Sequence, residues 1–214
     1  MEKIYFEEIV STQLYAKEKA VLGIKDEVYI AKKQTSGIGR NGHIWFSPEG
    51  GLYFSFITEK YNDIYTLTVG VAIHEALKEL YGIESKIKWP NDILVDNKKM
   101  AGIICEKIGN LVIVGIGVNT NFDANELENI ITTKSLLNLN VDNGILLKKI
   151  IENIDKLVYD NKVLTIFENN MAFIGEKRYI SQIGKMATIK GINEAGFLIV
   201  SDEDVDYRIS GGII

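Results

Sequence analysis

The chain has 214 residues, of which 46% are hydrophobic and 25% are charged, and its formal net charge is −5. A chain of this length and composition can bury a core and fold as one medium domain, alone or with a small appendage. The excess of acidic residues argues against general nucleic-acid binding, because proteins of that kind carry a basic surface that neutralises phosphates.

The N-terminal segment and the hydropathy predict a cytoplasmic protein that contacts no membrane. Acidic residues interrupt positions 1–8, so these do not form the apolar core of a signal peptide. No apolar run approaches the ~20 residues that a bilayer-spanning helix needs. The single cysteine, Cys105, cannot form an intramolecular disulfide, and its apolar neighbours predict a buried thiol.

Histidine and cysteine are too few for a metal centre of the zinc type. The histidines are His43 and His74, and Lys78 stands where an HExxH motif would place its second histidine. We expect no metal site built by protein side chains alone. A metal ion would be hard, bound by oxygen, and would arrive with a phosphate.

Helical and strand-like patterns alternate along most of the chain. In order, they predict a helix over residues 11–22, a strand at 28–31, a glycine-rich loop to residue 45, a strand at 51–57, a helix at 63–81, strands at 86–89, 100–107 and 111–118, and helices at 142–159 and 164–173. A Gly-Asn turn at 109–110 predicts a hairpin between the strands that flank it.

From about residue 178 onward the pattern predicts only short strands, at 186–190, 197–200 and 207–209. This is typical of a small β-barrel of roughly 35 residues, which is too small to be stable alone and should dock on the main domain. We therefore expect one domain over residues 1–178 and a small unit over residues 179–214.

The most unusual segment is Lys88–Asp92, with the sequence Lys-Trp-Pro-Asn-Asp between two apolar runs. Apolar packing alone does not require a cation, an aromatic ring, a proline, an amide and a carboxylate in five positions. The proline interrupts the strand-like pattern, and the Asn-Asp pair can hold a fixed loop. Taken alone, however, the segment also fits a polar turn in a hairpin.

The loop over residues 34–45 carries three glycines, which allow positive φ and a close approach of the backbone to a ligand. Between Val28 and Pro48 there is no acidic residue, whereas Lys32, Lys33 and Arg40 are present. This imbalance predicts a loop that contacts an anion through backbone N–H groups and Arg40. The alternative is a flexible, solvated loop.

Five segments, in order and spacing, resemble the biotin–protein ligases over essentially the whole chain. They are Ser11–Gln13, in the place of a Ser-Thr-Asn or Ser-Thr-Gln triplet; Gln34–Trp45, which resembles the biotin-binding GRGRxGRxW loop; Lys88–Asp92, which matches KWPND; Lys99–Ile103, which resembles KxAGIL; and Gly115–Asn121, which is similar to GIGxNxN. The resemblance is to the short type, which lacks an N-terminal helix-turn-helix domain.

This resemblance implies an α+β fold in which helices flank a class II synthetase-like mixed sheet, followed by a small C-terminal SH3-like β-barrel. It also implies a two-step reaction. Biotin and ATP would give biotinyl-5′-AMP and pyrophosphate, and a lysine of a biotin carboxyl carrier domain of a biotin-dependent carboxylase would then take the biotinyl group. Mg²⁺ would offset the charge of the pyrophosphate, and the short type would bind no DNA.

The resemblance also implies the roles of individual residues. Arg40 and Lys88 are the expected catalytic cations, since they would bridge a carboxylate and an α-phosphate that repel each other. The residues expected to bind biotin are Ser11, Thr12, Gln13, Gln34, Gly37, Ile38, Gly39, Arg40 and Lys88. Those expected to bind ATP are Arg40, Trp45, Asn91, Lys99 and Asn119.

The sequence departs from the family pattern at two loop positions. Ile38 stands where the family usually has its first loop arginine, and His43 replaces another basic residue. The lower charge of the loop predicts a weaker retention of the adenylate than is typical.

Two alternative functions stay open: a lipoate or octanoate ligase or transferase of the same fold, and a catalytically silent biotin sensor. The KWPND segment and the Ser-Thr-Gln triplet favour biotin over lipoate, and the presence of Arg40 and Lys88 favours an enzyme. The sequence does not determine whether the chain forms a homodimer.

Overall fold

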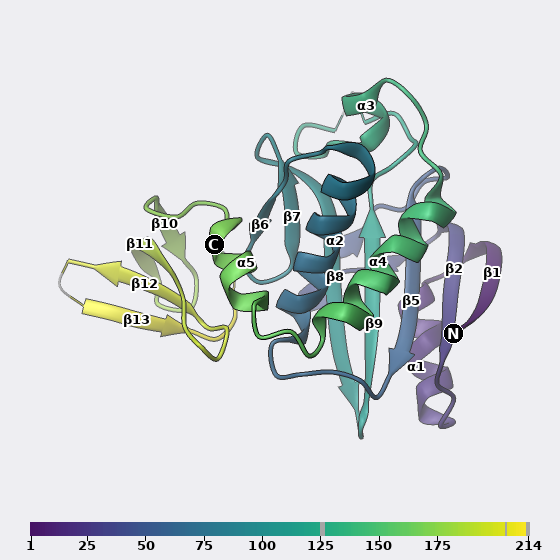
Figure 1. Ribbon diagram of the computed structural model, residues 1–214, viewed down its shortest axis with the longest axis horizontal. Coiled ribbons are helices and arrows are strands. Elements are labelled where there is room, and N and C mark those ends of the chain that lie inside the picture. The colour runs from purple at the N-terminus through teal and green to yellow at the C-terminus, as the bar shows by residue number, and fades with distance from the viewer. Residues whose placement is uncertain (125–126, 204, 213–214) are drawn as a thin grey trace.

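Seven strands form the larger of the two main sheets in the computed structural model, which describes residues 1–124, 127–203 and 205–212 (Figure 1). In spatial order they are β1 (Glu2–Ile9), β2 (Glu27–Gln34), β5 (Leu52–Thr58), β9 (Leu111–Val118), β8 (Lys98–Ile108), β7 (Asp92–Val95) and β6 (Lys86–Lys88). Strand β1 pairs with β2 in parallel, and every other neighbouring pair is antiparallel. The sheet is therefore mixed, as expected.

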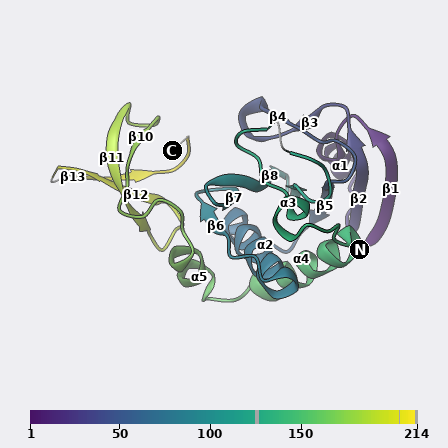
Figure 2. The ribbon, with the colours of Figure 1, turned by 90° about the horizontal axis from the view of Figure 1, so that it is seen from above.

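Helices cover the two faces of this sheet unequally (Figure 2). Helices α2 (Tyr65–Tyr81) and α4 (Asn143–Leu157) lie on one face, where they bury the main core. Helix α1 (Thr12–Val21) lies on the other face over a smaller apolar cluster. The short helices are α3 (Thr133–Leu137) and α5 (Val163–Asn169).

The glycine-rich loop lies on the same face as α1, beside the upper part of the sheet in Figure 2. It contains a two-residue hairpin, β3 (Gly37–Ile38) and β4 (Ile44–Trp45), with a single 3-10 turn (Arg40–Gly42) between them. The face with α1 therefore keeps a region that a loop covers in place of a second long helix.

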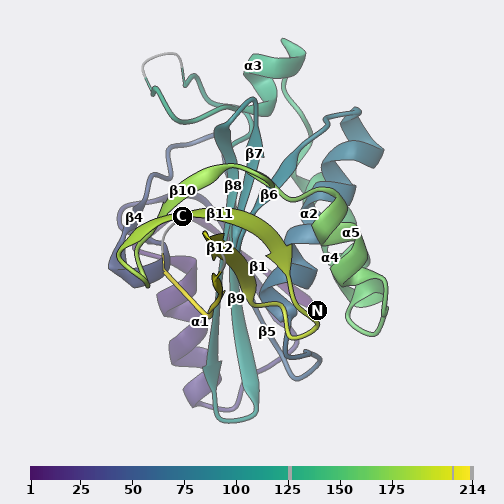
Figure 3. The ribbon, with the colours of Figure 1, turned by 90° about the vertical axis from the view of Figure 1, so that its left-hand side faces the viewer.

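The C-terminal residues form a separate four-stranded antiparallel sheet, which Figure 3 shows in front of the larger sheet. Its strands are β10 (Lys177–Ile180), β11 (Lys185–Ile192), β12 (Leu198–Asp202) and β13 (Val205–Ile209), paired in this order. Trp89 Nε1 donates to the carbonyl oxygen of Gly196 at 2.9 Å, and both are buried. The small sheet is thus docked on the Lys88–Asp92 segment.

The structure confirms the predicted α+β architecture, the four predicted helices and the 109–110 hairpin, with shifts of a few residues at the ends. It adds elements that the sequence did not predict, namely β1, the short strands β3 and β4, β7, α3 and β10. Strand β1 escaped prediction because adjacent charged residues near both of its ends leave only a short apolar run; Glu7 and Glu8 form ion pairs with Lys32 and Lys33 of β2 at 2.8 Å.

Two buried or half-buried groups correct or extend the expectations. Cys105 is half-buried rather than fully buried; it packs against the main core, and desolvation raises the pKa of its thiol to about 12. His74 is buried on α2 with its Nδ1 2.9 Å from Ser85 Oγ, and burial lowers the pKa of its imidazole. Within the described ranges, no helix combines the length and hydropathy that a bilayer crossing requires.

The docking bond between Trp89 and Gly196 can be tested by substitution. Trp89→Phe removes the indole donor and leaves the buried Gly196 carbonyl without its partner, so we expect the free energy of unfolding to fall by about 1–3 kcal/mol. Hydrogen exchange should increase in β11 and β12. The matched control is Trp45→Phe, because the Trp45 indole N–H has no partner within the described chain. Equal losses in the two variants would contradict the role of the bond.

Candidate active site

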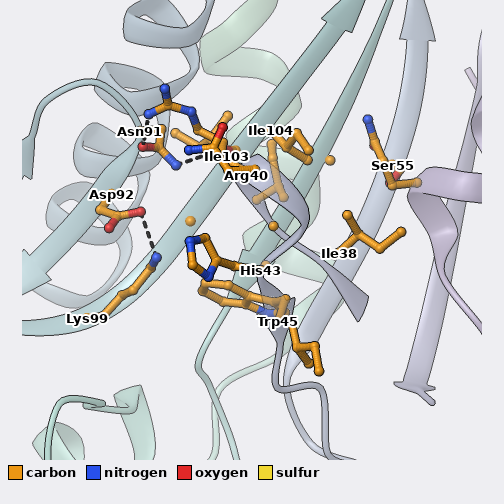
Figure 4. Close-up of a pocket in the computed structure, with 18 of the residues that line it drawn as sticks. Ile38, Arg40, His43, Trp45, Ser55, Asn91, Asp92, Lys99, Ile103 and Ile104 are labelled. Atoms are coloured by element: carbon orange, nitrogen blue, oxygen red, sulfur yellow. Dashed lines mark hydrogen bonds and ion pairs between the residues drawn. The ribbon is translucent and has the colours of Figure 1, made fainter. Parts of the chain in front are cut away.

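A pocket that encloses about 200 Å³ lies on the α1 face of the larger sheet, beneath the glycine-rich loop (Figure 4). Its walls come from the N-terminus of α1, the loop, strands β5, β8 and β9, and the Lys88–Asp92 segment. The lining residues are Ser11, Thr12, Gln13, Gln34, Ile38, Gly39, Arg40, Asn41, His43, Ile44, Trp45, Phe54, Ser55, Lys88, Trp89, Pro90, Asn91, Asp92, Lys99, Gly102, Ile103, Ile104, Gly115, Ile116, Gly117 and Gly212.

Three glycines of adjacent strands make room for the pocket contents. Gly102 of β8 pairs with Gly117 of β9, and a Cβ on either would collide with the indole of Trp45. A Cβ on Gly115 would lie 2.6 Å from Gln13 Oε1. The absence of side chains at these positions lets Trp45 and Gln13 lie directly on the sheet.

A chain of hydrogen bonds fixes the Gln34 amide next to the pocket. Its Oε1 accepts from the backbone N–H of Thr12 at 2.8 Å and from Thr12 Oγ1 at 3.1 Å. Its Nε2 donates to Ser47 Oγ at 2.8 Å, and that hydroxyl donates to the carbonyl oxygen of Trp45. The opposite amide orientation would set an NH₂ group against the Thr12 N–H. Gln34 therefore ties the loop to α1 through its own amide.

The same chain determines what Ser55 offers to a ligand. Thr12 Oγ1 lies 2.9 Å from Ser55 Oγ, and the Thr12 hydroxyl hydrogen is already directed to Gln34. Ser55 must then donate to Thr12, which leaves its lone pairs for the pocket. Ser55 is fully buried on β5, and it is a lining residue that the sequence analysis missed.

Gln13 provides a second acceptor at this end of the pocket. Its Nε2 donates to Glu106 Oε2 at 2.9 Å and lies 3.4 Å from the carbonyl oxygen of Ile113. Its Oε1 is buried and has no hydrogen-bond partner within the described chain. Ser11 caps α1 by accepting from Leu14 N at 3.5 Å, so its hydroxyl hydrogen stays available as a donor. This end therefore holds two acceptors and one donor.

Cations line the opposite side of the pocket, and Figure 4 shows Arg40 and Asn91 far from Ser55. Arg40 Nη1 donates to Asn91 Oδ1 at 2.9 Å, and Asn91 Nδ2 donates to the carbonyl oxygen of Ile103 at 3.0 Å. Asn91 thus holds the guanidinium in place without neutralising it. Lys88 forms no ion pair with the described residues, and burial lowers the pKa of its ammonium while Asp92 partly offsets this effect. A bound anion would favour its charged form.

A third cation, Lys99, is already paired. Its Nζ lies 2.7 Å from Asp92 Oδ1 and 5.0 Å from the ring centroid of Trp45. Lys99, Asp92 and Trp45 thus form a connected part of the pocket wall beside His43, and His43 itself is exposed. The ion pair with Asp92 offsets part of the charge that Lys99 would present to a phosphate.

The structure brings most of the predicted site residues together, with two exceptions. Gly37 lies behind the pocket wall, against Ser47 and Trp45. Asn119 is also outside the wall, since it is 2% exposed and its Nδ2 donates to the carbonyl oxygen of Lys99 at 2.8 Å. Its ATP-binding role stays a prediction. The signal for Ser55 was a single polar residue inside an otherwise apolar strand.

The glycine-backed surface can be tested by adding one methyl group. Gly117→Ala should displace the Trp45 indole, because the new Cβ would overlap it, and should shift the tryptophan emission to longer wavelength with little loss of secondary structure. Gly211→Ala is the matched control, since a Cβ at that position would meet no atom within 4 Å. An unchanged emission spectrum in Gly117→Ala would contradict the close packing of Trp45.

Comparisons with known proteins identify the family that the chain resembles in sequence and fold. The model of the Biotin/lipoate A/B protein ligase family matches residues 5–123. The bifunctional ligase/repressor BirA of Bacillus subtilis (strain 168) is 38% identical over 150 residues, covering 62% of this chain and 46% of the relative. BirA of Escherichia coli (strain K12) is 29% identical over 198 residues, covering 86% and 58%. The chain spans about half the length of these curated relatives.

Solved structures extend the similarity to nearly the whole chain. The biotin protein ligase from Aquifex aeolicus, in complex with biotin and ATP, has a TM-score of 0.86 and 30% identity, and the match covers 99% of this chain and 96% of that chain. The family model alone matches more than half of the 214 residues. The chain therefore belongs to the biotin/lipoate A/B protein ligase family.

Proposed function

We propose that the chain is an ATP-dependent biotin–protein ligase. The biotin carboxylate attacks the α-phosphorus of ATP, the bond to pyrophosphate breaks, and biotinyl-5′-AMP forms. The amine of a carrier lysine then attacks the acyl carbon, an amide bond forms, AMP leaves, and the amine proton passes to solvent. Mg²⁺ enters with ATP and offsets the charge of the pyrophosphate.

The observation that carries this proposal is the polar end of the pocket. A ureido ring has two N–H donors and one carbonyl acceptor, and this end offers two acceptors, Gln13 Oε1 and Ser55 Oγ, and one donor, Ser11 Oγ. All three residues are at most 2% exposed. A ligand of complementary pattern would satisfy Gln13 Oε1, which is buried without a partner in the described chain, and would add a second bond to the Ser11 and Ser55 hydroxyls.

The same observation argues against the lipoate or octanoate alternative. A dithiolane ring or an alkyl chain cannot donate a hydrogen bond, so Gln13 Oε1 would stay buried and unsatisfied at a cost of about 1–3 kcal/mol, and Ser55 Oγ would gain no bond beyond its contact with Thr12. The name of the Aquifex complex, which contains biotin and ATP, is consistent with the preference for biotin.

Catalysis of the first step is positioning and electrostatics. Arg40 lies on the side of the pocket away from Ser55 (Figure 4), and Lys88 lines the same pocket. Neither cation has an ion-pair partner in the described chain, so their charge is available to the two anions that must meet. Asn91 holds Arg40 by a hydrogen bond in addition to its proposed contact with the nucleotide, and Trp45 offers a ring face to the adenine. Two free cations in the described part of the pocket favour an enzyme over a silent sensor.

The acceptor and the organisation of the chain are part of the proposal. One relative is named biotin--[acetyl-CoA-carboxylase] ligase, in Mycobacterium tuberculosis, which supports a carboxylase carrier domain as the acceptor. We assign the catalytic chemistry to residues 1–178, and residues 179–214 to a small unit that docks on this domain. We further propose that the protein is cytoplasmic and binds no DNA. A homodimer is compatible with the exposed edge strand β1.

Removal of either free cation should abolish adenylation without unfolding the chain. Lys88→Ala and Arg40→Ala should each lower the rate of biotinyl-5′-AMP formation by about 100-fold or more, because the two anions lose a bridging charge. Single-turnover assays with labelled ATP measure this rate. Lys98→Ala is the control, since Lys98 is exposed and outside the pocket. Near-normal rates in both Lys88→Ala and Arg40→Ala would overturn the assignment.

A further inference from the structure

Glu106 lies outside the pocket, and it contacts the pocket residue Gln13. It is on β8, two residues beyond Ile104, which is a lining residue, and it pairs with Ile113 of β9. Lys17 Nζ lies 2.6 Å from Glu106 Oε1, and Gln13 Nε2 donates to the other oxygen, Oε2, at 2.9 Å. Each carboxylate oxygen therefore has one partner on α1.

Gln13 and Lys17 can both reach this carboxylate because they lie four residues apart on one face of α1. The two contacts hold the carboxylate from both sides. Glu106 is about one-third exposed, with a side-chain exposure of 33%, whereas Gln13 is 2% exposed. A partly exposed ion pair thus anchors a fully buried amide.

The partners on this side of Gln13 admit only one orientation of its amide. A carboxylate and the carbonyl oxygen of Ile113 are both pure acceptors, so the NH₂ group must face them and Oε1 must face the pocket. With the reverse orientation, the amide oxygen would oppose two other oxygens, and the pocket would present a donor in place of an acceptor.

We propose that Glu106, braced by Lys17, is a positioning residue that makes Gln13 an obligate hydrogen-bond acceptor for a ligand N–H. The inference rests on the proposed function, because the ligand N–H is then one of the two in the ureido ring. Glu106 touches neither the pocket nor the reacting atoms, and it acts only through Gln13. Its loss would free the amide to rotate and weaken the selection of an N–H donor.

A double-mutant cycle tests this dependence. Biotin binding is measured by calorimetry for the wild type, Glu106→Leu, Gln13→Leu and the variant with both changes. We expect each single substitution to weaken binding about tenfold, as for loss of a buried hydrogen-bond partner. The double variant should bind like Gln13→Leu alone, since Glu106 has no effect without Gln13. Glu59→Leu, which removes another lysine-paired glutamate outside the pocket lining, should bind like the wild type.

A second measurement needs no ligand. The side-chain NH₂ signal of Gln13, assigned in ¹⁵N–¹H spectra by its loss in Gln13→Leu, should move in Glu106→Leu and move less in Lys17→Leu. If Glu106→Leu fails to fold, the shift of the Gln13 NH₂ signal can still be measured in Lys17→Leu.

The outcomes separate the inference from the function on which it rests. Wild-type affinity in Glu106→Leu, or losses that add in the double variant, would overturn the positioning role while biotin binding by the wild type still supports the function. If the wild type binds no biotin, the proposed function fails, and the Gln13 signal alone decides: an unmoved signal overturns the orientation, and a shifted one supports it.

Discussion

The pocket depends on a surface of the sheet that carries no side chains. Gly102, Gly115 and Gly117 lie on the central strands β8 and β9, and each position is closed to a Cβ by a neighbour that packs on the backbone. Because these positions lack side chains, Trp45 and Gln13 can lie against the sheet backbone, in the space that a layer of aliphatic side chains would otherwise fill. The opposite face of the same strands is an ordinary apolar core beneath α2 and α4.

Hydrogen-bond direction then sets the chemistry of that space. At one end, protein partners take up the donors of Ser55 and Gln13, so both expose acceptors, while Gln34 links the loop to α1. On the other side, Asn91 orients Arg40 by a neutral contact and leaves its charge available. A single pocket thus combines a neutral polar end for a donor-rich head group with a cationic region for anions, which is the arrangement that an adenylating ligase requires.

The motifs predicted the composition of the site better than the roles within it. Segments such as Lys88–Asp92 and Ser11–Gln13 place chemically demanding residues in sequence, and the fold brings them together in the pocket. The orientation of the Gln13 side-chain amide cannot be predicted from local sequence, because it depends on Glu106, which is 93 positions away in the chain. The structure adds protein partners for the amides of Gln34 and Asn119, and their predicted contacts with biotin and ATP stay predictions.

The elements that escaped prediction share a physical cause. Strand β1 is held by one neighbour and has charged residues near both ends, so Ile4 and Phe6, which pack on the smaller apolar cluster, give too short an alternating signal. Helix α3 is a single short turn of five residues fixed by a capping box between Thr132 and Ser135, below the length at which periodicity is informative. Local sequence predicts an element well when the element is long and buries one face. It predicts poorly when an element is short and forms only because of tertiary contacts.

The sharpest test of biotin adenylation is pyrophosphate–ATP isotope exchange with the purified wild-type chain, in the presence of biotin, of lipoate or of neither. We expect exchange with biotin only, since both acids carry a carboxylate but only biotin can donate hydrogen bonds to Gln13 Oε1 and Ser55 Oγ. Exchange with lipoate, or no exchange under any of the three conditions, would contradict the proposed ligase.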